Sequence, residues 1–520
     1  MNGRALDDAV PIRLWVGVTG HRTVADEPGL RAAVRAVVAA CRQTLRAQGV
    51  TEVRLGVVSA LAEGADRVVS RTILEEPGAV LEVTLPMPVD DYRSDFVTGE
   101  SRTEFDELLA RAAIVRGAEP LHDRETAYLV AGQRVVERCD VLVAVWDGRA
   151  ARGPGGTANV VGIARQAAHG PAVFRVVPGT WDVRPDGRRL DVAPFRSVDR
   201  LNRERAVTPE GWLAMVTGAA GEAGLPDGAL EEPLRWIARP YARADLLAGH
   251  YQRLYNLGSS ALFFGSALAV VLGALQVLLL RDQVWLVLAE ALVMVALLAL
   301  LVVARREELH GRWLGYRALA EACRSALFLA LTHGDDSLAA PALKRSERWV
   351  PRAYEEIWIA RPRGGPAVGL EPLRALVADG WVVDQLQYQA RAAGRLEAHE
   401  RRLSAGISAL FAATLTAAAL HFWLDWAHVE AGTNVVALFS ISLPAVGAAL
   451  GGLRAQRDYQ RNANRARQSA VALTVLRDRL TAVTCDEDLR TVCRAVASHL
   501  AQENRGWYDD MVFHDVELHV

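Results

Sequence analysis

Hydrophobic residues are distributed unevenly along this chain, and they are most concentrated in a pair of segments near its middle. Residues 257–280 contain no charged side chain, and residues 284–304 are interrupted only by Glu290. A helix needs about twenty apolar residues to cross the hydrocarbon core of a bilayer, and each segment reaches that length. Because only Arg281-Asp282-Gln283 separates the two segments, the pattern predicts an antiparallel transmembrane hairpin.

A second pair of apolar segments repeats this layout. Residues 403–424 and 432–453 contain no Asp, Glu, Lys or Arg. A polar helix with aromatic residues precedes each hairpin, and an arginine-rich helix follows it. Residues 242–335 and 381–482 are therefore interpreted as a tandem repeat of one helix–hairpin–helix unit. The sequence predicts an all-α membrane region with four transmembrane helices.

Two polar residues inside the first hairpin allow two interpretations. At about 1.5 Å per residue, Gln276 and Glu290 reach a similar depth, roughly 10 Å below the tip. One interpretation is a hydrogen bond between them that fixes the hairpin. The other is a polar layer that lines a pore when several chains associate, because ionisable groups within membranes usually face a bundle interior.

The placement of arginine predicts the orientation of the spans. Arginines flank the outer ends of both hairpins, whereas the tips show no basic excess. By the positive-inside rule both termini and the N-terminal domain face the cytoplasm. The abundance of Ala and Arg is typical of a GC-rich bacterial genome, so the sequence predicts a multi-pass protein of the bacterial inner membrane. The same arginines suit anionic lipid headgroups as partners. The flanking residues are Arg243, Arg253, Arg305, Arg306, Arg312 and Arg317, and then Arg395, Arg401, Arg402, Arg454, Arg457, Arg461, Arg465 and Arg467.

Short apolar runs alternate with helical periodicity in the first 180 residues. This alternation is typical of a doubly wound parallel sheet, so it predicts an α/β, Rossmann-like domain. Ligands bind such sheets at the carboxyl ends of the strands. The predicted strands are residues 12–18, 53–59, 80–85, 141–146 and 172–177.

Glycine and polar residues follow three of these strands and form the candidate ligand site. Gly155 and Gly156 allow backbone N–H groups to approach a phosphate at the N-terminus of the next helix, where the helix dipole favours an anion. Arg22 is suited either to clamping a phosphate or to pairing with Asp147 across the strand ends. The candidate ligand-binding residues are Thr19, Gly20, His21, Arg22, Ser59, Glu63, Gly64, Asp66, Asp147, Gly148, Gly155, Gly156 and Thr157.

Other chemistry in this region is less specific. Glu63 and Asp66 suit ribose hydroxyls, although Asp66 equally suits a helix cap. His21 is interpreted as a packed or hydrogen-bonded histidine, and no residue is assigned as catalytic. The five cysteines lack the spacing of a zinc site, so the sequence predicts free thiols, no metal and no cofactor apart from the ligand. The net charge of −2 gives no reason to expect nucleic acid as a partner.

These patterns predict six segments along the chain. Residues 1–11 lack the apolar core of a signal peptide, so the N-terminal domain is expected to stay in the cytoplasm. The segments are the α/β domain (1–180), connecting helices and loops (181–241), the first membrane unit (242–335), a linker (336–380), the second membrane unit (381–482) and a C-terminal helix with a tail (483–520).

As an ordered set, the motifs of residues 11–180 resemble the SLOG superfamily, which includes the LOG phosphoribohydrolases, DprA and the sensor region of TRPM channels. The resemblance implies a Rossmann-like pocket for a nucleotide. LOG enzymes carry Pro-Gly-Gly-x-Gly-Thr followed shortly by a catalytic glutamate. Here the loop that begins at Pro154 lacks the second glycine spacing and that glutamate, which favours binding over hydrolysis. The motifs are Val18-Thr-Gly-His-Arg22, Glu63-Gly-Ala-Asp66, Cys139-Asp140, Trp146-Asp-Gly148 and Gly155-Gly-Thr157.

The hairpins resemble SLATT domains in architecture, which are two-transmembrane effectors found with SLOG and nucleotide-signalling modules. Together the resemblances imply a homo-oligomeric effector of bacterial anti-phage defence. Its N-terminal domain would bind a cyclic nucleotide or an ADP-ribose derivative, and its hairpins would then form a pore or disrupt the membrane. Two alternatives stay open. One is a membrane-anchored hydrolase of N-glycosidic bonds that uses Asp66, Glu63 or Asp147. The other is a constitutive channel or transporter, which the few intramembrane polar groups do not favour.

Overall fold

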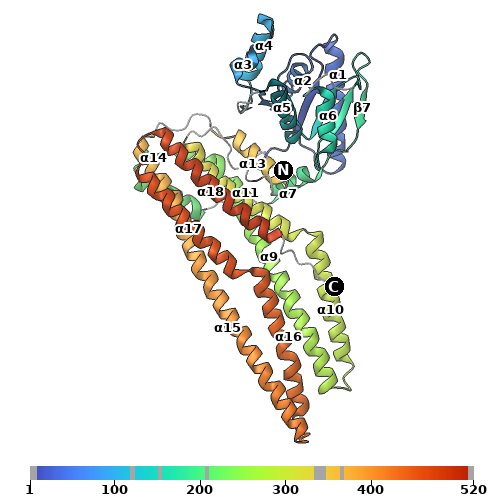
Figure 1. Cartoon of the computed structure of the whole chain (residues 1–520), viewed down its shortest axis with the longest axis vertical. Coiled ribbons are helices and arrows are strands. Elements are labelled where there is room, and N and C mark those ends of the chain that lie inside the picture. The colour runs from blue at the N-terminus through green and yellow to red at the C-terminus, as the bar shows by residue number, and fades with distance from the viewer. Residues whose placement is uncertain are drawn as a thin grey trace. The chain divides into compact units, whose positions relative to one another are not determined.

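The chain separates into two compact units (Figure 1). Met1–Arg205 and Glu355–Ala360 form the α/β unit, and Ala206–Tyr354 and Arg361–Val520 form the helical unit. The computed structural model describes residues 9–117, 123–149, 155–204, 210–332, 343, 347–362 and 368–512, with side chains as far as residue 506.

A seven-stranded sheet in the order β4-β3-β2-β1-β5-β6-β7 organises the described part of the α/β unit. Its first six strands are parallel, and only β7 runs antiparallel, against β6. The apolar pattern predicted five of these strands and missed β4 and β7. It missed them because β4 is very short and β7 carries charged residues in place of an apolar run. The strands are β1 Arg13–Gly20, β2 Arg54–Ser59, β3 Val80–Thr84, β4 Ile114–Arg116, β5 Val141–Val145, β6 Ala172–Val176 and β7 Val183–Asp186.

Helices cover both faces of the sheet, which confirms the predicted α/β, Rossmann-like fold. On one face, α5 and α6 bury Trp15, Val58 and Leu142 of the strands in a continuous apolar core. On the other face, α1 and α2 pack against each other above Leu55. The helices are α1 Glu27–Ala47, α2 Ala65–Leu74, α3 Val89–Arg93, α4 Gly99–Ala110, α5 Arg124–Arg138, α6 Thr157–Gln166 and α7 Ala193–Arg203.

A distant helical segment completes the amino-end edge of the sheet. Helix α13 (Trp349–Ile359) begins in the helical unit, and its last residues belong to the α/β unit. There Glu356 accepts hydrogen bonds of 2.7 and 2.9 Å from the guanidinium of Arg13, and both side chains are at least 96% buried. The predicted linker 336–380 therefore contains a structural helix. Its two adjacent glutamates resemble a solvated helix face, and only the fold reveals their arginine partners.

A second ion cluster surrounds the buried carboxylate of Glu82 on β3. Arg138 donates to Glu82 at 2.9 Å and also to Glu355, while Arg116 donates to Glu82 at 2.7 Å. Burial by itself would raise the pKa of Glu82, but the two guanidiniums outweigh that effect and hold the pKa below its ordinary value. The charges at this edge of the sheet are thus compensated inside the α/β unit.

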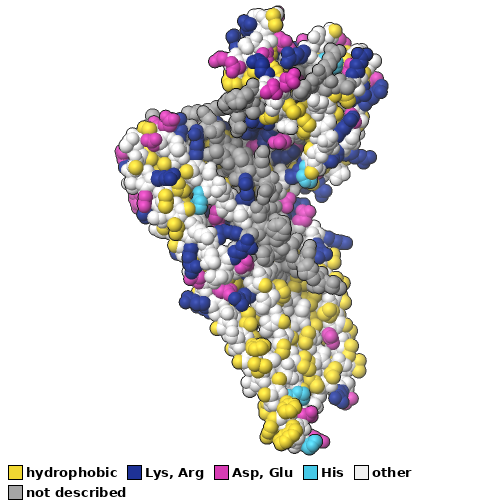
Figure 2. Space-filling view, in the orientation of Figure 1, with side chains coloured by type: hydrophobic (Ala, Val, Ile, Leu, Met, Phe, Trp, Pro, Cys, Tyr) yellow, Lys and Arg dark blue, Asp and Glu magenta, His cyan; other side chains and the backbone are white. Residues whose placement is uncertain are grey.

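In the described part of the helical unit, four helices are long and apolar enough to cross a membrane. At most 17% of each apolar window is buried, and Figure 2 shows hydrophobic side chains spread over their surface. Such a surface suits lipid rather than water. The helices of the unit are α8 Glu210–Glu222, α9 Glu231–Leu278, α10 Trp285–Arg306, α11 Leu309–Leu331, α14 Leu370–Val377, the π-helical segment η2 Ala378–Val383, α15 Asp384–Trp426, α16 Thr433–Arg457, α17 Tyr459–Thr481 and α18 Asp486–Val512.

The two membrane segments follow the same structural plan. Each starts with a long helix, α9 or α15, that includes both the polar helix and the first span, which the sequence analysis treated as separate elements. Each second span ends at a single residue in the left-handed conformation, Glu308 (φ 49°) after α10 and Asp458 (φ 37°) after α16. The following helices, α11 and α17, both contain 23 residues. The equivalent breaks support the interpretation of a tandem repeat.

Removing the carboxylate of Glu356 tests the ion pair at the amino-end edge of the sheet. We expect Glu356→Ala to lower the free energy of unfolding by about 3–5 kcal/mol, because it leaves the guanidinium of Arg13 buried without its charged partner. Hydrogen exchange of the β1 and β2 amides measures this loss. As the control, Asp182→Ala removes the exposed pair with Arg184 and should cost less than about 1 kcal/mol. Equal effects of the two substitutions would contradict a structural role for α13 in the sheet.

Candidate functional site

The candidate site lies where the direction of strand addition reverses. β2, β3 and β4 follow on one side of β1, and β5 and β6 lie on its other side. In open α/β sheets, ligands bind beyond the carboxyl ends of the strands at this reversal. Gly20 ends β1 in register with Val145 of β5. A Cβ at Gly20 would approach Cβ of Ala65 to 2.6 Å, so only glycine lets α2 begin this close to the strand ends.

The N-terminus of α6 faces this edge without a side-chain cap. Gly156 is the N-cap residue, and Thr157 is the first residue of the helix. Gly155 adopts φ 77°, and a Cβ there would lie 2.9 Å from Cβ of Tyr128 on α5. The first N–H groups of a helix have no partners within the helix, and the helix dipole favours an anion at that end. The backbone at Gly155, Gly156 and Thr157 is therefore chemically suited to a phosphate. Two further residues of the predicted loop, Gly153 and Pro154, lie outside the described residues.

Arg22 supplies an exposed positive charge at the site. Its side chain is exposed, and its guanidinium carbon lies 5.7 Å from the centroid of the Tyr128 ring. The Tyr128 hydroxyl donates to Asp95, and burial followed by this carboxylate raises the tyrosine pKa. The predicted alternative of an Arg22–Asp147 ion pair is absent among the described contacts. Arg22 and Gly155 both lie next to Tyr128, so Arg22 is close to the N-terminus of α6.

Asp147 and His21 approach each other after β5 and β1. The Asp147 carboxylate accepts from the backbone N–H of Arg149 at 3.0 Å. This hydrogen bond, with a smaller contribution from the charge of His21, lowers the Asp147 pKa. Gly148 adopts φ 91°, and Arg175 of β6 donates to the Asp147 carbonyl oxygen at 2.6 Å. Asp147 is consequently an exposed, ionised acceptor on the rim of the site, suited to a ligand hydroxyl.

The polar side chains of the loop after β2 hydrogen-bond mainly to one another and to the backbone of the loop. Ser59 donates to Asp66 at 3.3 Å, and Asp66 also accepts from the backbone N–H groups of Ala60 and Ala62. Burial raises the pKa of Asp66 to about 7, despite these hydrogen bonds. Asp66 therefore stabilises a tight loop that contains the left-handed residue Leu61 (φ 57°). It lies in the first turn of α2 and is not the N-cap residue.

Gly64 is the N-cap of α2, and it joins this loop to the end of β1. It adopts φ 79°, and a Cβ there would lie 2.2 Å from the carbonyl oxygen of Arg22. The N–H of Ala65 donates to the carbonyl oxygen of His21 at 3.0 Å. The N-terminus of α2 thus binds the Thr19–Arg22 turn itself. Glu63 remains half-buried and accepts from the hydroxyl of Ser101 on α4.

Two residues that sequence reasoning missed complete the surroundings of the site. Tyr128 lies on α5 in an ordinary amphipathic pattern, so its contact with Gly155 follows only from the fold. Arg67 is 2% exposed, lies over the ring of Phe96 and donates to the carbonyl oxygen of Ser101 at 2.8 Å. Its burial follows only from the fold, because α2 also carries other polar and charged residues.

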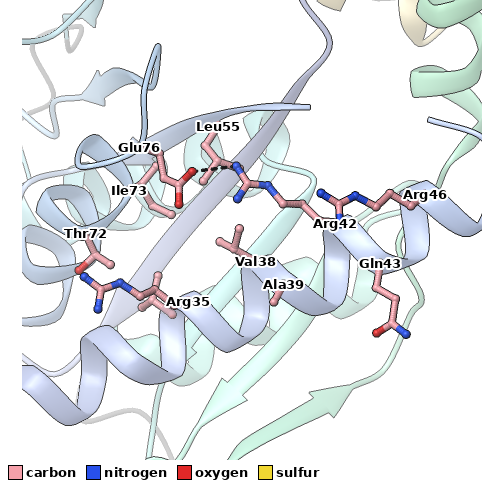
Figure 3. A pocket seen from close by; sticks show the side chains of 11 residues that line it. Arg35, Val38, Ala39, Arg42, Gln43, Arg46, Leu55, Thr72, Ile73 and Glu76 are labelled. Atoms are coloured by element: carbon pink, nitrogen blue, oxygen red, sulfur yellow. Dashed lines mark hydrogen bonds and ion pairs between the residues drawn. The ribbon is translucent and has the colours of Figure 1, made fainter. Parts of the chain in front are cut away.

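A separate cavity of about 350 Å³ lies between α1 and α2 (Figure 3). Val38, Leu55 and Ile73 form its apolar part, and Arg42 pairs with Glu76 at 2.9 Å on its border. None of the predicted ligand residues lines it. Because Leu55 lies at the start of β2, this cavity belongs to the edge of the sheet opposite the candidate site.

In the first hairpin, Glu290 lies opposite Gly273 of α9. A Cβ at Gly273 would be 3.3 Å from Oε2 of Glu290. No hydrogen bond joins Gln276 to Glu290 among the described contacts, so the interpretation of a fixing bond is not supported. Glu290 is half-buried in a single chain. The described residues contain no group of three metal-ligating side chains. No disulfide joins any of the five cysteines, of which Cys485 is exposed.

Comparisons with known proteins add no assignment to this geometry. No protein-family model matches the chain, and no curated protein sequence matches it. The functional argument therefore rests on the residues at the strand ends, the four apolar helices and the motifs in the sequence.

The raised pKa of Asp66 predicts a pH dependence of stability. In the unfolded chain Asp66 loses its proton near the ordinary pKa of 3.8, whereas in the folded chain it keeps the proton up to about pH 7. Asp66 therefore makes the folded protein less stable as the pH rises from about 4 to 7. We expect the thermal midpoint of Asp66→Asn to fall less than that of the wild type between pH 5.5 and 7.5. The exposed substitution Asp91→Asn serves as the control. Parallel curves for Asp66→Asn and the wild type would contradict the prediction.

Proposed function

We propose that this protein is a membrane effector controlled by a nucleotide-derived second messenger. The α/β unit binds a cyclic nucleotide or an ADP-ribose derivative at the carboxyl ends of β1 and β5. Binding leads several chains to associate, and their hairpins form a pore or disrupt the membrane. The SLOG-like motifs of the sequence and the SLATT-like architecture of the hairpins support this proposal and favour a role in bacterial anti-phage defence.

One observation carries the ligand part of the proposal. The uncapped N-terminus of α6 and the exposed guanidinium of Arg22 lie around Tyr128 at the reversal point of the sheet. A helix N-terminus and an arginine are the groups that proteins use to hold phosphate. The exposed carboxylate of Asp147 is suited to a ribose hydroxyl at the same edge. These groups belong to the α/β unit and lie together without any rearrangement of the strands.

Binding is favoured over hydrolysis of an N-glycosidic bond. Asp66 is buried, and its carboxylate accepts hydrogen bonds from the loop after β2. The carboxylate of Glu63 accepts a hydrogen bond from the hydroxyl of Ser101. Asp147 has a lowered pKa, whereas an acid catalyst needs a raised one. Release of free base from nucleotides by the purified protein, lost in Asp147→Asn, would support the hydrolase alternative instead.

We place both termini in the cytoplasm and the spans in the bacterial inner membrane. Arg305 and Arg306 end α10, and Arg401 and Arg402 precede the second hairpin. These four side chains are exposed, and none has an ion-pair partner among the described contacts. Free arginines at one end of the spans fit the cytoplasmic face and its anionic lipids.

Arg22 tests the ligand site. We expect purified protein in liposomes to release trapped dye when the correct nucleotide is added. Arg22→Ala should shift the required nucleotide concentration upward by about ten- to a hundredfold, because a hydrogen bond to a charged group contributes about 1.5–3 kcal/mol. Arg184→Ala, which removes an exposed arginine of β7, is the matched control. Mass spectrometry of the nucleotide retained by the protein identifies the ligand to use.

Two results would contradict the proposal. One is leakage that responds to no nucleotide, and the other is an identical dose response for the wild type and Arg22→Ala.

Glu290 tests the pore. If several chains place this carboxylate around an aqueous path, it favours cations, and Glu290→Gln should shift the reversal potential in a KCl gradient toward zero. Asp282→Asn, at the exposed hairpin tip, removes a charge outside the hydrocarbon and should change the potential less. An unchanged reversal potential in Glu290→Gln would show that Glu290 does not line the path.

A further inference from the structure

The helical unit contains a cavity of about 230 Å³ at the ends of the spans opposite the hairpin tips. Tyr255 and Asn256 of α9 line it just before the first span, and Arg457 lines it at the end of the fourth-span helix, α16. Helices α11, α15, α17 and α18 contribute the other walls. Roughly 10–15 Å³ of such volume holds one water, so the cavity has room for a small organic molecule. Both repeats therefore share one cavity.

Arg457 brings an uncompensated charge to this cavity. Its guanidinium donates to the Tyr459 hydroxyl at 3.3 Å, the Ser260 hydroxyl at 3.1 Å and the carbonyl oxygen of Asn256 at 3.4 Å. Its Nε is buried without a hydrogen-bond partner. None of its partners in the described structure is a carboxylate. A partly buried guanidinium whose hydrogen-bond partners are all neutral groups is costly unless an anion binds it.

Gln456, the neighbouring residue, leaves a second polar atom without a partner. Its Nε2 donates to the Tyr255 hydroxyl at 3.0 Å, and its Oε1 is buried without a hydrogen bond. A ligand hydroxyl or amine would satisfy this oxygen. Tyr255 in turn stacks on His310 at 4.6 Å between centroids, so the side of the cavity that carries Gln456 is rigidly supported.

The charge balance of the lining is positive. Arg317, Arg457 and Arg465 face the cavity, and Glu503 is the single carboxylate that lines it in the described structure. Burial raises the pKa of Glu503 in spite of Arg317. Carboxylates outside the lining also act on two of the arginines, Glu321 on Arg317 and Asp458 on Arg465, which leaves Arg457 as the arginine that an anion would bind. The lining also carries tyrosine hydroxyls and amide groups. Arginine and hydrogen-bonding groups in a concave site suit a phosphate group with a polar substituent.

We propose that this cavity is a second ligand site, which binds a phosphate-bearing anion at the guanidinium of Arg457 and the amide of Gln456. The ligand joins α9 and α11 of the first repeat to α15, α16 and α17 of the second. Two sources carry this chemistry: the headgroup of an anionic phospholipid, and a soluble phosphate ester. The site is independent of the nucleotide site in the α/β unit.

Two substitutions and a matched control test the site in the full chain, reconstituted in phosphatidylcholine nanodiscs. Arg457→Gln removes the guanidinium. Gln456→Glu supplies a carboxylate that neutralises Arg457 and can accept from Tyr255, so this variant keeps its fold. Gln460→Glu makes the same change on the exposed side of α17, outside the cavity. The thermal midpoint of Gln456→Glu should equal or exceed that of the wild type.

The soluble probe is radiolabelled glycerol 3-phosphate in equilibrium dialysis. The lipid probe is phosphatidylglycerol, counted by native mass spectrometry after purification from mixed lipids. We expect the wild type to retain at least one probe, and Arg457→Gln and Gln456→Glu to bind it at least tenfold more weakly. Gln460→Glu and Arg22→Ala should bind as the wild type does. Retention of the lipid alone identifies a headgroup site, and binding of the soluble probe identifies a phosphate ester.

The proposal is overturned if the wild type retains neither probe, or if Gln456→Glu binds as tightly as the wild type. Loss of binding in Arg22→Ala would overturn it as well, because the probe would then occupy the α/β unit. Nucleotide-triggered dye release is a separate measurement, so failure of the nucleotide proposal and failure of this one remain distinguishable.

Discussion

The helical unit depends on one constraint, that a backbone in hydrocarbon must form its hydrogen bonds within its own segment. Each of the four apolar runs is therefore helical, and α9 and α15 continue as unbroken helices into the polar region. The second spans end at one left-handed residue each, Glu308 and Asp458. As a result, the polar layer beneath the spans is built by the same helices. The cavity at Tyr255 and Arg457 takes its geometry directly from the hairpins.

The arginines at the amino-end edge of the sheet are paired differently from those at the two proposed sites, and this difference separates charges that stabilise the fold from charges that are available to a ligand. At the amino-end edge of the sheet, Arg13 and Arg138 have carboxylate partners that are themselves buried. Such closed clusters hold the fold and leave no charge for a ligand. At the carboxyl-end edge Arg22 is exposed beside an aromatic ring, and in the helical unit Arg457 contacts only neutral groups. An arginine without a carboxylate partner among the described contacts is the common property of both proposed sites.

The sequence predicted the features that depend on the residue pattern within one element. It did not predict the features that depend on contacts between residues far apart in the chain. Continuous apolar runs identified five strands and four spans, because each pattern reflects burial of a single element. The turns at Gly20 and Gly64 were found through residue type, although the sequence could not show that Gly64 packs on Arg22. The sequence left Asp66 open between a ribose hydroxyl and a helix cap, but its partners are the Ser59 hydroxyl and backbone groups of its own loop. The role of α13 was missed because its glutamates find their arginines more than two hundred residues away.

Helix α13 contributes residues to both units. Trp349 of α13 contacts Tyr316 of α11, whose ring stacks on Tyr251 of α9, four residues before the cavity residue Tyr255. Further along the same helix, Glu356 holds Arg13 at the start of β1, the strand that ends at the predicted ligand turn. Helix α13 thus contributes Trp349 to the packing of the helical unit and Glu356 to the ion pairs of the α/β unit. The sequence of this short helix shows neither role, because each contact depends on residues far along the chain.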